Sequence, residues 1–390
     1  MHLIKYINSG YNIFSSALIA TVLWSCGGNG KPGREVENTD GVQFTRIDMN
    51  LAPDFYDSVI NLLPEPELVV LKENDSTMYA DLDKLIVRNG KYFVLDSFGA
   101  RTVVSFTKNG DPLGKYGNVG QGPGEYVLPM DMDVDSSGVY ILDARAKKLL
   151  KYKETGEFIG EKTIPVIAES FRLLGNGDIM FSIMPDGNGG PRLCITDSLM
   201  EVKKRFLPSE VGYVGGWRTN DIFRACNGST IYYKAPLDTM YLFNRDGKAK
   251  NGMVFDFGSR SVPEEAKRDF ISASEEESFK GTRMLANSPI PLANGLMVGI
   301  VVEDDSQYVV LFDPTRNRCG GKKCDESGAI FDIIEPIASD ENGDLISYIS
   351  QEYAATLEGY QYLPDTIKSG LEMANRMLLI YSFSSLKNHE

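Results

Sequence analysis

The sequence predicts an all-β fold built from a repeated unit of four short strands. Two stretches align over most of their length with an offset of 46 or 47 residues, which is the length of one propeller blade. Within each stretch, short apolar runs typical of buried strands alternate with Gly-containing turns. Six such units need roughly 280 residues, and the chain of 390 residues supplies them with room for insertions. We therefore predict a six-bladed β-propeller with short helical insertions.

The two clearest units lie between residues 85 and 165. In the first unit, the runs Tyr92–Leu95 and Val103–Phe106 predict two buried strands, and Asn109-Gly110 predicts the hairpin turn that follows. The second unit repeats this order, and the matching positions are Asp96 and Asp143, Phe106 and Tyr152, Gly110 and Gly156, and Gly114 and Gly160. Because the acid recurs once per unit with a base after it, at Arg101 or Lys148, we interpret it as a structural salt bridge or turn brace.

Weaker copies of the unit follow, and two segments interrupt them. Four further strand-and-turn patterns begin at Gly175, Asn227, Asn294 and Asp340. The N-terminal strand Val42–Asp48 is expected to complete one blade, which would close the ring and remove the sheet edges. Helix-forming residues from Pro263 to about Lys280, and around Ile367–Arg376, predict helical insertions in loops between strands.

The N-terminus has the features of an export signal. The first 25 residues contain one basic residue, Lys5, and no acidic residue, and the apolar run Ile13–Trp24 is shorter than the about 20 residues of a membrane span. The run ends Leu23-Trp24-Ser25-Cys26, which resembles the bacterial lipobox, whose cysteine becomes lipidated, although Trp24 departs from the usual small residue. We expect a lipoprotein signal peptide at 1–25, a flexible tether at 26–41 and the propeller at 42–390; an ordinary signal peptide is the alternative.

A lipid anchor on Cys26 makes the membrane the first expected partner. Two or three acyl chains hold a protein stably on a bilayer, so we expect an exported protein anchored to the outer membrane. The face remains open between the periplasm and the cell surface. The first acidic residues after Cys26, Glu35 and Glu37, come late, which slightly favours the periplasmic face.

Charge and histidine content exclude several function classes. The formal net charge is -14, which argues against a nucleic-acid partner because such proteins need a basic surface. The two histidines, His2 and His389, lie at the extreme ends of the chain. The folded region therefore cannot build a Ser-His-Asp or Cys-His nucleophile or a His-ligated zinc site.

One glycine-rich segment points to a known family. Residues 115–126 contain Gly120-Gln121-Gly122-Pro123-Gly124-Glu125-Tyr126, and a second string, Asp238-Thr239-Met240-Tyr241, occurs later. These strings resemble NHL-type propeller repeats, and most closely those of six-bladed β-propeller lipoproteins of Gram-negative gut bacteria. The resemblance implies a fold and an envelope location rather than an activity. Because no Lys-Ser/Thr follows, we interpret the glycines as a tight crossing between blades, not as a phosphate loop.

Three residues in a glycine-rich loop are the candidate ligand-binding residues. Tyr213, Trp217 and Arg218 lie together, and Trp217 is the only tryptophan after the expected cleavage site. Aromatic side chains in such a loop could stack on a sugar ring or anchor a partner protein. The alternative is that Trp217 folds back onto a blade as part of the core.

Two further patterns have structural interpretations. Cys319-Gly320-Gly321-Lys322-Lys323-Cys324 is consistent with a turn closed by a Cys319–Cys324 disulfide, which an exported protein is free to form, and free thiols are the alternative. The alternation of aspartate with apolar residues from Asp131 to Asp135 predicts a strand with one polar face. A calcium loop is disfavoured because Gly is missing at its sixth position and Glu at its twelfth.

We therefore expect a cell-envelope lipoprotein whose propeller binds a ligand or a protein without catalysis. A carbohydrate or an envelope protein is the candidate partner, and the sequence assigns no catalytic residue, metal or cofactor. The alternative is a divalent-cation-dependent hydrolase or lactonase with carboxylate ligands in the central channel, since oxygen ligands need no histidine. Channel-facing acids that converge on one point would favour the hydrolase, whereas a channel lined by apolar residues or by Arg and Lys would favour binding.

Overall fold

The computed structural model describes residues 38–39, 41–184, 190–209, 221–268, 279–324, 333–356, 363–374 and 376–386. The chain divides into two compact units, Met1–Glu35 and Val36–Glu390, and every described element belongs to the second. The expected signal peptide and nearly all of the expected tether lie outside the described residues.

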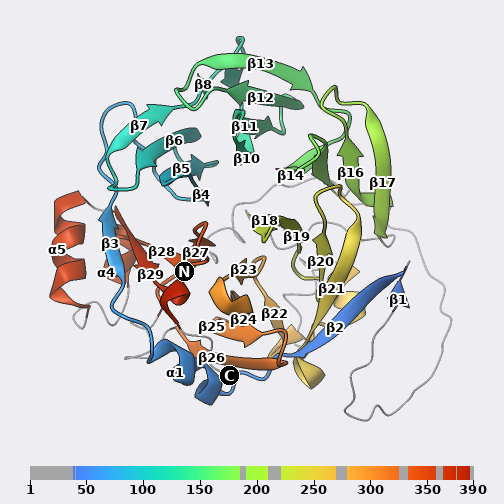
Figure 1. Ribbon diagram of the computed structural model, residues 1–390, viewed down its shortest axis with the longest axis vertical. Helices are drawn as coiled ribbons and strands as arrows, with labels where there is room; N and C mark the ends of the chain where they lie inside the picture. The colour runs from blue at the N-terminus through green and yellow to red at the C-terminus, as the bar shows by residue number, and fades with distance from the viewer. Residues whose placement is uncertain are drawn as a thin grey trace. The chain divides into compact units, whose positions relative to one another are not determined.

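The second unit is a six-bladed β-propeller, as the sequence predicts. Figure 1 shows the blades arranged as a ring, with the first strand of each blade nearest the centre. Blades 1 to 3 are antiparallel sheets of four strands in chain order. They comprise β4 (Lys84–Arg88), β5 (Lys91–Asp96), β6 (Thr102–Thr107) and β7 (Pro112–Lys115); β10 (Pro129–Asp135), β11 (Gly138–Asp143), β12 (Lys148–Tyr152) and β13 (Phe158–Thr163); and β14 (Ala168–Leu173), β15 (Ile179–Ile183), β16 (Gly190–Thr196) and β17 (Val202–Ser209).

Blades 4 to 6 keep this order with additions. Blade 4 carries two extra strands on its outer side, and the inner strand of blade 5 is split in two. They comprise β18 (Phe223–Cys226), β19 (Ser229–Tyr232), β20 (Thr239–Phe243), β21 (Ala249–Asp256), β2 (Val42–Asp48) and β1 (Asn38–Thr39); β22 (Arg283–Leu285), β23 (Ile290–Pro291), β24 (Met297–Glu303), β25 (Ser306–Asp313) and β26 (Arg318–Lys323); and β27 (Pro336–Ser339), β28 (Leu345–Ser350), β29 (Arg376–Tyr381) and β3 (Glu67–Val70).

The strand that closes the ring is β3, not the predicted Val42–Asp48. β3 pairs antiparallel with β29, with Val70 opposite Met377, and so supplies the fourth strand of blade 6. The expected closing strand, β2, instead pairs in parallel with β21. The physical reason is that blade 4 already has four strands of its own. Blade 6 receives three from the C-terminal part of the chain, which leaves the edge of β29 to be covered.

In the described residues, the α-helices lie between strands. Two of them fall in the predicted insertions, α2 (Glu264–Arg268) and α5 (Asp365–Ala374), and α5 ends earlier than expected because Arg376 already belongs to β29. α4 (Gln351–Thr356) precedes α5, and α1 (Pro53–Ile60), which we did not predict, links β2 to β3. None of these helices has the length and apolar composition that a bilayer span requires.

The hydrophobic core is divided into six clusters, each between two adjacent blades. β5 shows how one strand serves two clusters. Tyr92 and Val94 pack between blades 6 and 1, whereas Phe93 and Leu95 pack between blades 1 and 2. Alternate side chains of a strand point to opposite faces, so a blade with a neighbour on each side needs apolar residues on both. This explains the continuous apolar runs in the sequence.

Closure by β3 predicts a large effect of one leucine. Leu71 follows β3 directly, is fully buried, and belongs to the cluster between blades 6 and 1. Leu71→Ala should lower the free energy of unfolding by about 2–5 kcal/mol, measured by urea denaturation, because a cavity replaces the side chain at the closure. The control is Leu113→Ala on β7, where the side chain is 49% exposed, with an expected loss below about 0.5 kcal/mol. Equal losses in the two variants would contradict this account of ring closure.

Candidate ligand-binding pocket

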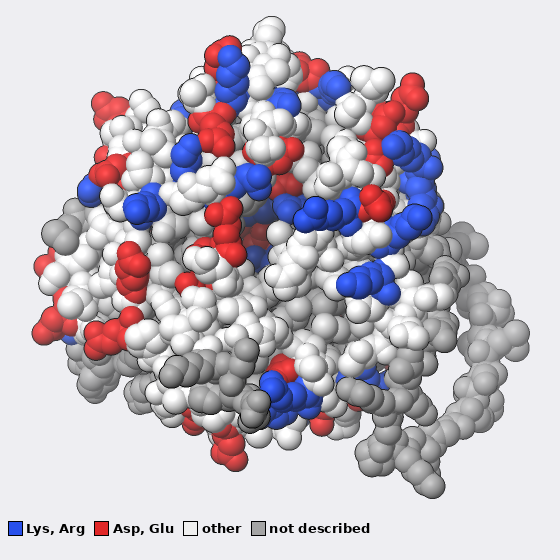
Figure 2. Space-filling view, in the orientation of Figure 1, with Lys and Arg blue, Asp and Glu red and all other residues white. Residues whose placement is uncertain are grey.

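Four charged side chains with little exposure to solvent connect the blades at the centre of the ring. Lys84 on β4 donates from Nζ to Asp131 Oδ1 on β10, at 2.7 Å, and Asp131 Oδ2 accepts from the Ser170 hydroxyl and the Phe171 N–H on β14. Lys84 Nζ also lies 4.0 Å from Oδ1 of Asp221, which precedes β18. Charged side chains of both signs border the hollow at the centre of the face in Figure 2.

Arg224 extends this network to the remaining two blades. Its guanidinium pairs with Asp221 at 2.8 Å and donates to the carbonyl oxygens of Ser288 in blade 5 and Ile337 in blade 6, both at 2.9 Å. Burial lowers the pKa of Arg224, and the Asp221 carboxylate partly offsets this effect. We call Lys84, Asp131, Asp221 and Arg224 the central charge network. Two bases balance two acids, so these acids hold the blades together rather than standing free for a cation.

Asp131 and Asp133 confirm the predicted strand with one polar face. Both lie on β10 with their side chains buried, and Asp133 pairs with Arg172 at 2.6 Å and accepts from the Leu173 N–H. Residues two apart share a face of a strand, and this face meets β14 of the next blade. The aspartates therefore join adjacent blades, which is the physical reason for their alternation.

Asp96 and Asp143 act as turn braces, as predicted. The Asp96 carboxylate accepts N–H groups of Gly99 and Ala100 in its own turn and of Ala80 and Asp81 in the preceding loop. Asp143 repeats the pattern in blade 2, with donors Arg145, Ala146 and Val127. Lys148, the expected salt-bridge partner of Asp143, pairs with Glu161 at 2.9 Å. Each aspartate thus fixes an inter-blade loop against a turn.

The glycine-rich segment is the predicted crossing between blades. It runs from β7 of blade 1 to β10 of blade 2 and contains the short parallel pair β8 (Asn118–Val119) and β9 (Glu125–Tyr126). Gly117 has φ +70°, and a Cβ there would lie 2.5 Å from the Tyr152 hydroxyl oxygen. That hydroxyl donates to the Gly124 carbonyl, at 3.0 Å. The aromatic side chain can approach the crossing only because glycine has no side chain.

A pocket of about 520 Å³ lies beside helix α1, on blades 5 and 6. α1 begins at Pro53, which suits a first helical position, and it has two apolar stripes. Tyr56 and Ile60 are buried in the core cluster between these blades. Phe55, Val59 and Leu62 follow each other at spacings of four and three residues and line the pocket. Phe55 and Val59 also pack against this cluster, but they are only partly buried and so remain partly accessible to a ligand.

Gly320 allows α1 to lie against β26. A Cβ on Gly320 would come within 2.6 Å of the Ala52 carbonyl oxygen and 2.7 Å of the Tyr56 nitrogen. Such distances do not occur between real side chains and backbone, so only glycine fits beneath the start of the helix. The Gly320-Gly321 pair, which we expected to form a turn, is thus part of a strand.

The expected disulfide between Cys319 and Cys324 is wrong for the same reason. Neither cysteine forms a disulfide, and an extended strand separates their Cα atoms by about 16 Å, whereas a disulfide needs about 7 Å or less. They also lie on opposite faces: Cys319 packs between blades 4 and 5, and Cys324 against the cluster between blades 5 and 6. Burial raises the pKa of the Cys319 thiol to about 12, so this thiol is unreactive near neutral pH.

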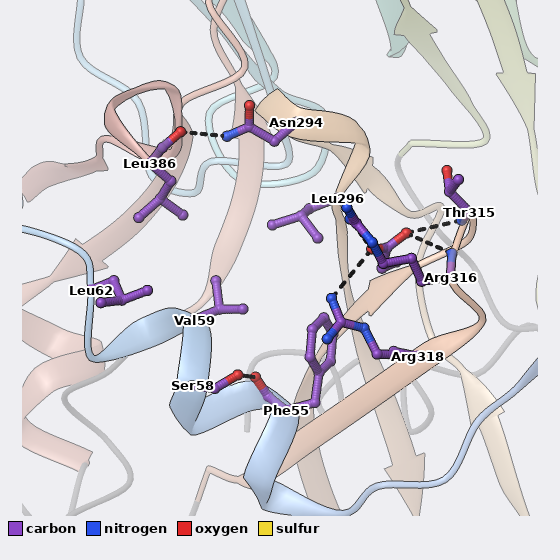
Figure 3. Close-up of a pocket in the computed structure, with 11 residues that line it drawn as sticks. Phe55, Ser58, Val59, Leu62, Asn294, Leu296, Thr315, Arg316, Arg318 and Leu386 are labelled. Atoms are coloured by element: carbon purple, nitrogen blue, oxygen red, sulfur yellow. Dashed lines mark hydrogen bonds and ion pairs between the residues drawn. The ribbon is translucent and has the colours of Figure 1, made fainter. Parts of the chain in front are cut away.

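The other wall of the pocket is polar. It is formed by the segment Asp313–Arg318, between β25 and β26, together with Asn294, which donates to the carbonyl oxygens of Phe383 and Leu386. Figure 3 shows Arg316 and Arg318 on one side of the pocket and Val59, Leu62 and Leu386 on the other. The pocket is therefore amphipathic, with a basic wall facing an apolar one.

Asp313 is the acid of this wall. Its Oδ1 accepts the N–H groups of Thr315 and Arg316, and its Oδ2 lies 3.0 Å from Arg316 Nη1 and 3.6 Å from Arg318 Nη2. Burial alone would raise its pKa, but the hydrogen bonds from Arg316 and Thr315 outweigh burial and hold the pKa of Asp313 below its ordinary value. Asp313 therefore stays ionised at neutral pH and fixes the turn that carries both arginines.

The remaining candidate residues from the sequence lie outside the described residues. These are the lipidation candidate Cys26 and the loop residues Tyr213, Trp217 and Arg218. Their roles stay predictions.

Comparison with known proteins places the chain in a family. A family described as a domain of unknown function, DUF4934, matches residues 57–375. The chain belongs to the DUF4934 family. No curated protein is significantly similar to this DUF4934 protein.

Solved structures share the fold of the DUF4934 protein. One is described as a candidate exported protein of Bacteroides fragilis; it is 17% identical, has a TM-score of 0.71, and the match covers 86% of this chain and 99% of the other. A DUF4221-family protein of Bacteroides vulgatus is 11% identical with a TM-score of 0.54, over 82% and 97% of the two chains. At these identities the likeness concerns the fold alone.

Sequence reasoning missed the pocket of the DUF4934 protein. One signal was present, because Phe55, Val59 and Leu62 have helical spacing after Pro53. A second stripe at Tyr56 and Ile60 marks a helix with apolar residues on more than one face. No local pattern in the sequence indicates that the polar wall, which comes from segments far along the chain, lies beside this helix.

Burial of the central charge network predicts a strong response to loss of one charge. Lys84→Met should lower the free energy of unfolding of the DUF4934 protein by about 3–5 kcal/mol, because Asp131 is left buried without its counter-charge. The matched control is Lys72→Met. The Lys72–Asp111 distance is also 2.7 Å, but these side chains are 57% and 49% exposed, so the expected loss is about 0–1 kcal/mol. Urea denaturation measures both losses. Similar losses would show that burial does not determine how much an ion pair contributes to the free energy of unfolding.

Proposed function

We propose that this protein is a non-enzymatic ligand-binding propeller of the cell envelope, with its binding site in the pocket beside α1. The observation that carries the proposal is an amphipathic cavity of about 520 Å³, within the range of small-molecule sites. Its apolar wall contains Phe55 and Val59, which pack against the core but are only partly buried, and the exposed Leu62, and its basic wall is fixed by Asp313. A rigid frame with one accessible apolar surface and oriented charges suits binding.

The charges at the centre of the ring favour binding over hydrolysis. A hydrolase with a divalent cation needs several acids that converge on one point. In the described part of the chain, Asp131, Asp133 and Asp221 are each paired with a lysine or arginine. No group of three or more His, Cys, Asp or Glu residues that could hold a metal ion occurs among the described residues. The hydrolase alternative has no specific observation in its favour.

The location is part of the proposal and rests on the N-terminal sequence. Lipidation of Cys26 would anchor the protein to the outer membrane, and the Gly-rich segment after it would act as a tether. A description as a candidate exported protein, for the similar Bacteroides fragilis structure, is consistent with export. Tyr213, Trp217 and Arg218 remain candidates for contact with a carbohydrate or an envelope protein.

A pocket-filling variant tests the binding site. Val59 lines the pocket from α1, so Val59→Trp should fill the cavity and abolish ligand-induced stabilisation. The assay is a thermal-shift screen of acidic, neutral and basic small molecules on the full chain carrying Cys26→Ala. A ligand at 100 times its Kd stabilises by about 2.7 kcal/mol, which gives a shift of several degrees.

The control variant and the fate of the ligand complete this test. Val119→Trp makes the same change on β8, where Val119 is 48% exposed, and should keep the shift. Mass spectrometry of each ligand after incubation, with and without divalent cations, should recover it unchanged. Products of hydrolysis would contradict a non-enzymatic role, and an equal shift in both Trp variants would contradict this pocket as the site.

The lipid anchor has its own test. In a Gram-negative host, the wild-type chain should fractionate with the outer membrane and incorporate a labelled fatty acid. Cys26→Ala should abolish the label and release the protein from the membrane fraction, because two or three acyl chains dominate its membrane affinity. Cys194→Ala is the control, since that thiol is fully buried in the core, and it should keep the label. Label that persists in Cys26→Ala would contradict the anchor.

A further inference from the structure

We propose that the ligand of this pocket is an amphiphilic anion: a molecule with one carboxylate or similar acidic group on an unbranched apolar body. This inference rests on the proposed function of the same pocket and names the chemistry of its ligand. Three observations carry it: the charge of the lining, the position of Arg318, and the apolar stripe that begins beside it.

The lining carries a surplus positive charge. Arg316 and Arg318 are its bases and Asp313 is its acid, so two positive charges face one negative charge. Asp313 already accepts two N–H groups and the Arg316 guanidinium, and Arg318 reaches it only at 3.6 Å. This surplus occurs in a chain whose net charge is -14. An anion that enters the pocket therefore meets a local field opposite to that of the protein as a whole.

Arg318 stands where the polar and apolar walls meet. Its guanidinium carbon lies 4.6 Å from the centroid of the Phe55 ring, and the side chain is 52% exposed. Stacking on an aromatic ring orients the guanidinium, while its N–H groups stay available in the plane for a carboxylate. An acidic group bound at Arg318 is thus placed directly beside Phe55, which is the first residue of the apolar stripe.

The apolar stripe predicts the shape of the rest of the ligand. Phe55 and Val59 on α1, and Leu62 just past its end, lead away from Arg318 (Figure 3), and Leu62 remains 51% exposed. Leu296 and Leu386 line the same pocket from other segments. An apolar body along this line removes these side chains from water, which is favourable by roughly 25 cal/mol per Å² buried.

Neither the acidic group nor the apolar body is sufficient alone for tight binding in this pocket. A neutral apolar molecule would cover the arginines without replacing the water that hydrates them, which costs free energy. A small anion such as acetate would pair with Arg318 but would leave the stripe in water, so it would gain no free energy from apolar burial. The arrangement therefore selects a molecule with both parts, oriented with its acid at Arg318 and its body toward Leu62.

Three probes test this on the full chain carrying Cys26→Ala. Decanoate has both parts, 1-decanol has the body without the charge, and acetate has the charge without the body. Isothermal titration should give decanoate the lowest Kd, at least tenfold below that of decanol, with acetate not competing at the same concentration.

Two pairs of variants assign each half of the ligand to its wall. Arg318→Met keeps a side chain over Phe55 but removes the charge, so it should weaken decanoate at least tenfold and leave decanol unchanged. Its control is Arg46→Met, an exposed arginine paired with Asp256 at 2.8 Å on another blade. Leu62→Ser should weaken decanoate and decanol alike. Its control is Leu113→Ser, at a site of matching exposure, 49%.

The outcomes separate this inference from the proposed function. Equal affinity for decanol and decanoate, or no effect of Arg318→Met, would overturn the anionic part. Competition by acetate as effective as that by decanoate would overturn the amphiphilic part. If the screen finds only neutral or basic ligands that Val59→Trp abolishes, the inference is wrong and the binding function stands. If no ligand depends on Val59, both are wrong.

Discussion

The pairing of four charged side chains, little exposed to solvent, at the centre of the ring is the interaction on which the rest of the structure depends. The apolar clusters join each blade only to its two neighbours. The central charge network reaches further, since Lys84 of blade 1 faces Asp221 at blade 4, and Arg224 binds carbonyl oxygens of blades 5 and 6. Removing one partner from a desolvated charge pair is costly, so the network links all six blades near the centre of the ring.

The pocket arises where the chain departs from its own repeat. Blades 5 and 6 receive a helix that no other blade has in the described residues, because α1 lies between the added strand β2 and the closing strand β3. Gly320 lets the helix approach the outer strand of blade 5, and the turn at Asp313 presents two arginines beside it. The six blades thus supply a rigid frame, and the insertion that contains α1 supplies one wall of the pocket.

The sequence predicts local features well and long-range placement poorly. The offset between Asp96 and Asp143 identifies the blades, because the repeated unit and its brace are each encoded within about 50 residues. The strand Val42–Asp48 was identified correctly as a strand, but no local pattern specifies which sheet edge it covers. Cys319 and Cys324 suggested a turn because two glycines lie between them, and only the contact with α1 shows why glycine is needed. The pocket combines segments from residues 55 to 386, so it exists only after the ring has formed.

Ring closure by β3 determines when this protein can finish folding. Val70 is made early and pairs with Met377, more than 300 positions later, so the sixth blade must wait for nearly the whole chain. Contacts of this separation carry a large loop-closure entropy and form slowly. A chain threaded across a membrane from its N-terminus would therefore emerge with β3 unpaired, and its edge would stay open until the last strands arrived. For an exported chain, translocation and folding would then be separated in time by the topology itself. The exposed edge of β3 would most need protection from other strands in the interval before closure.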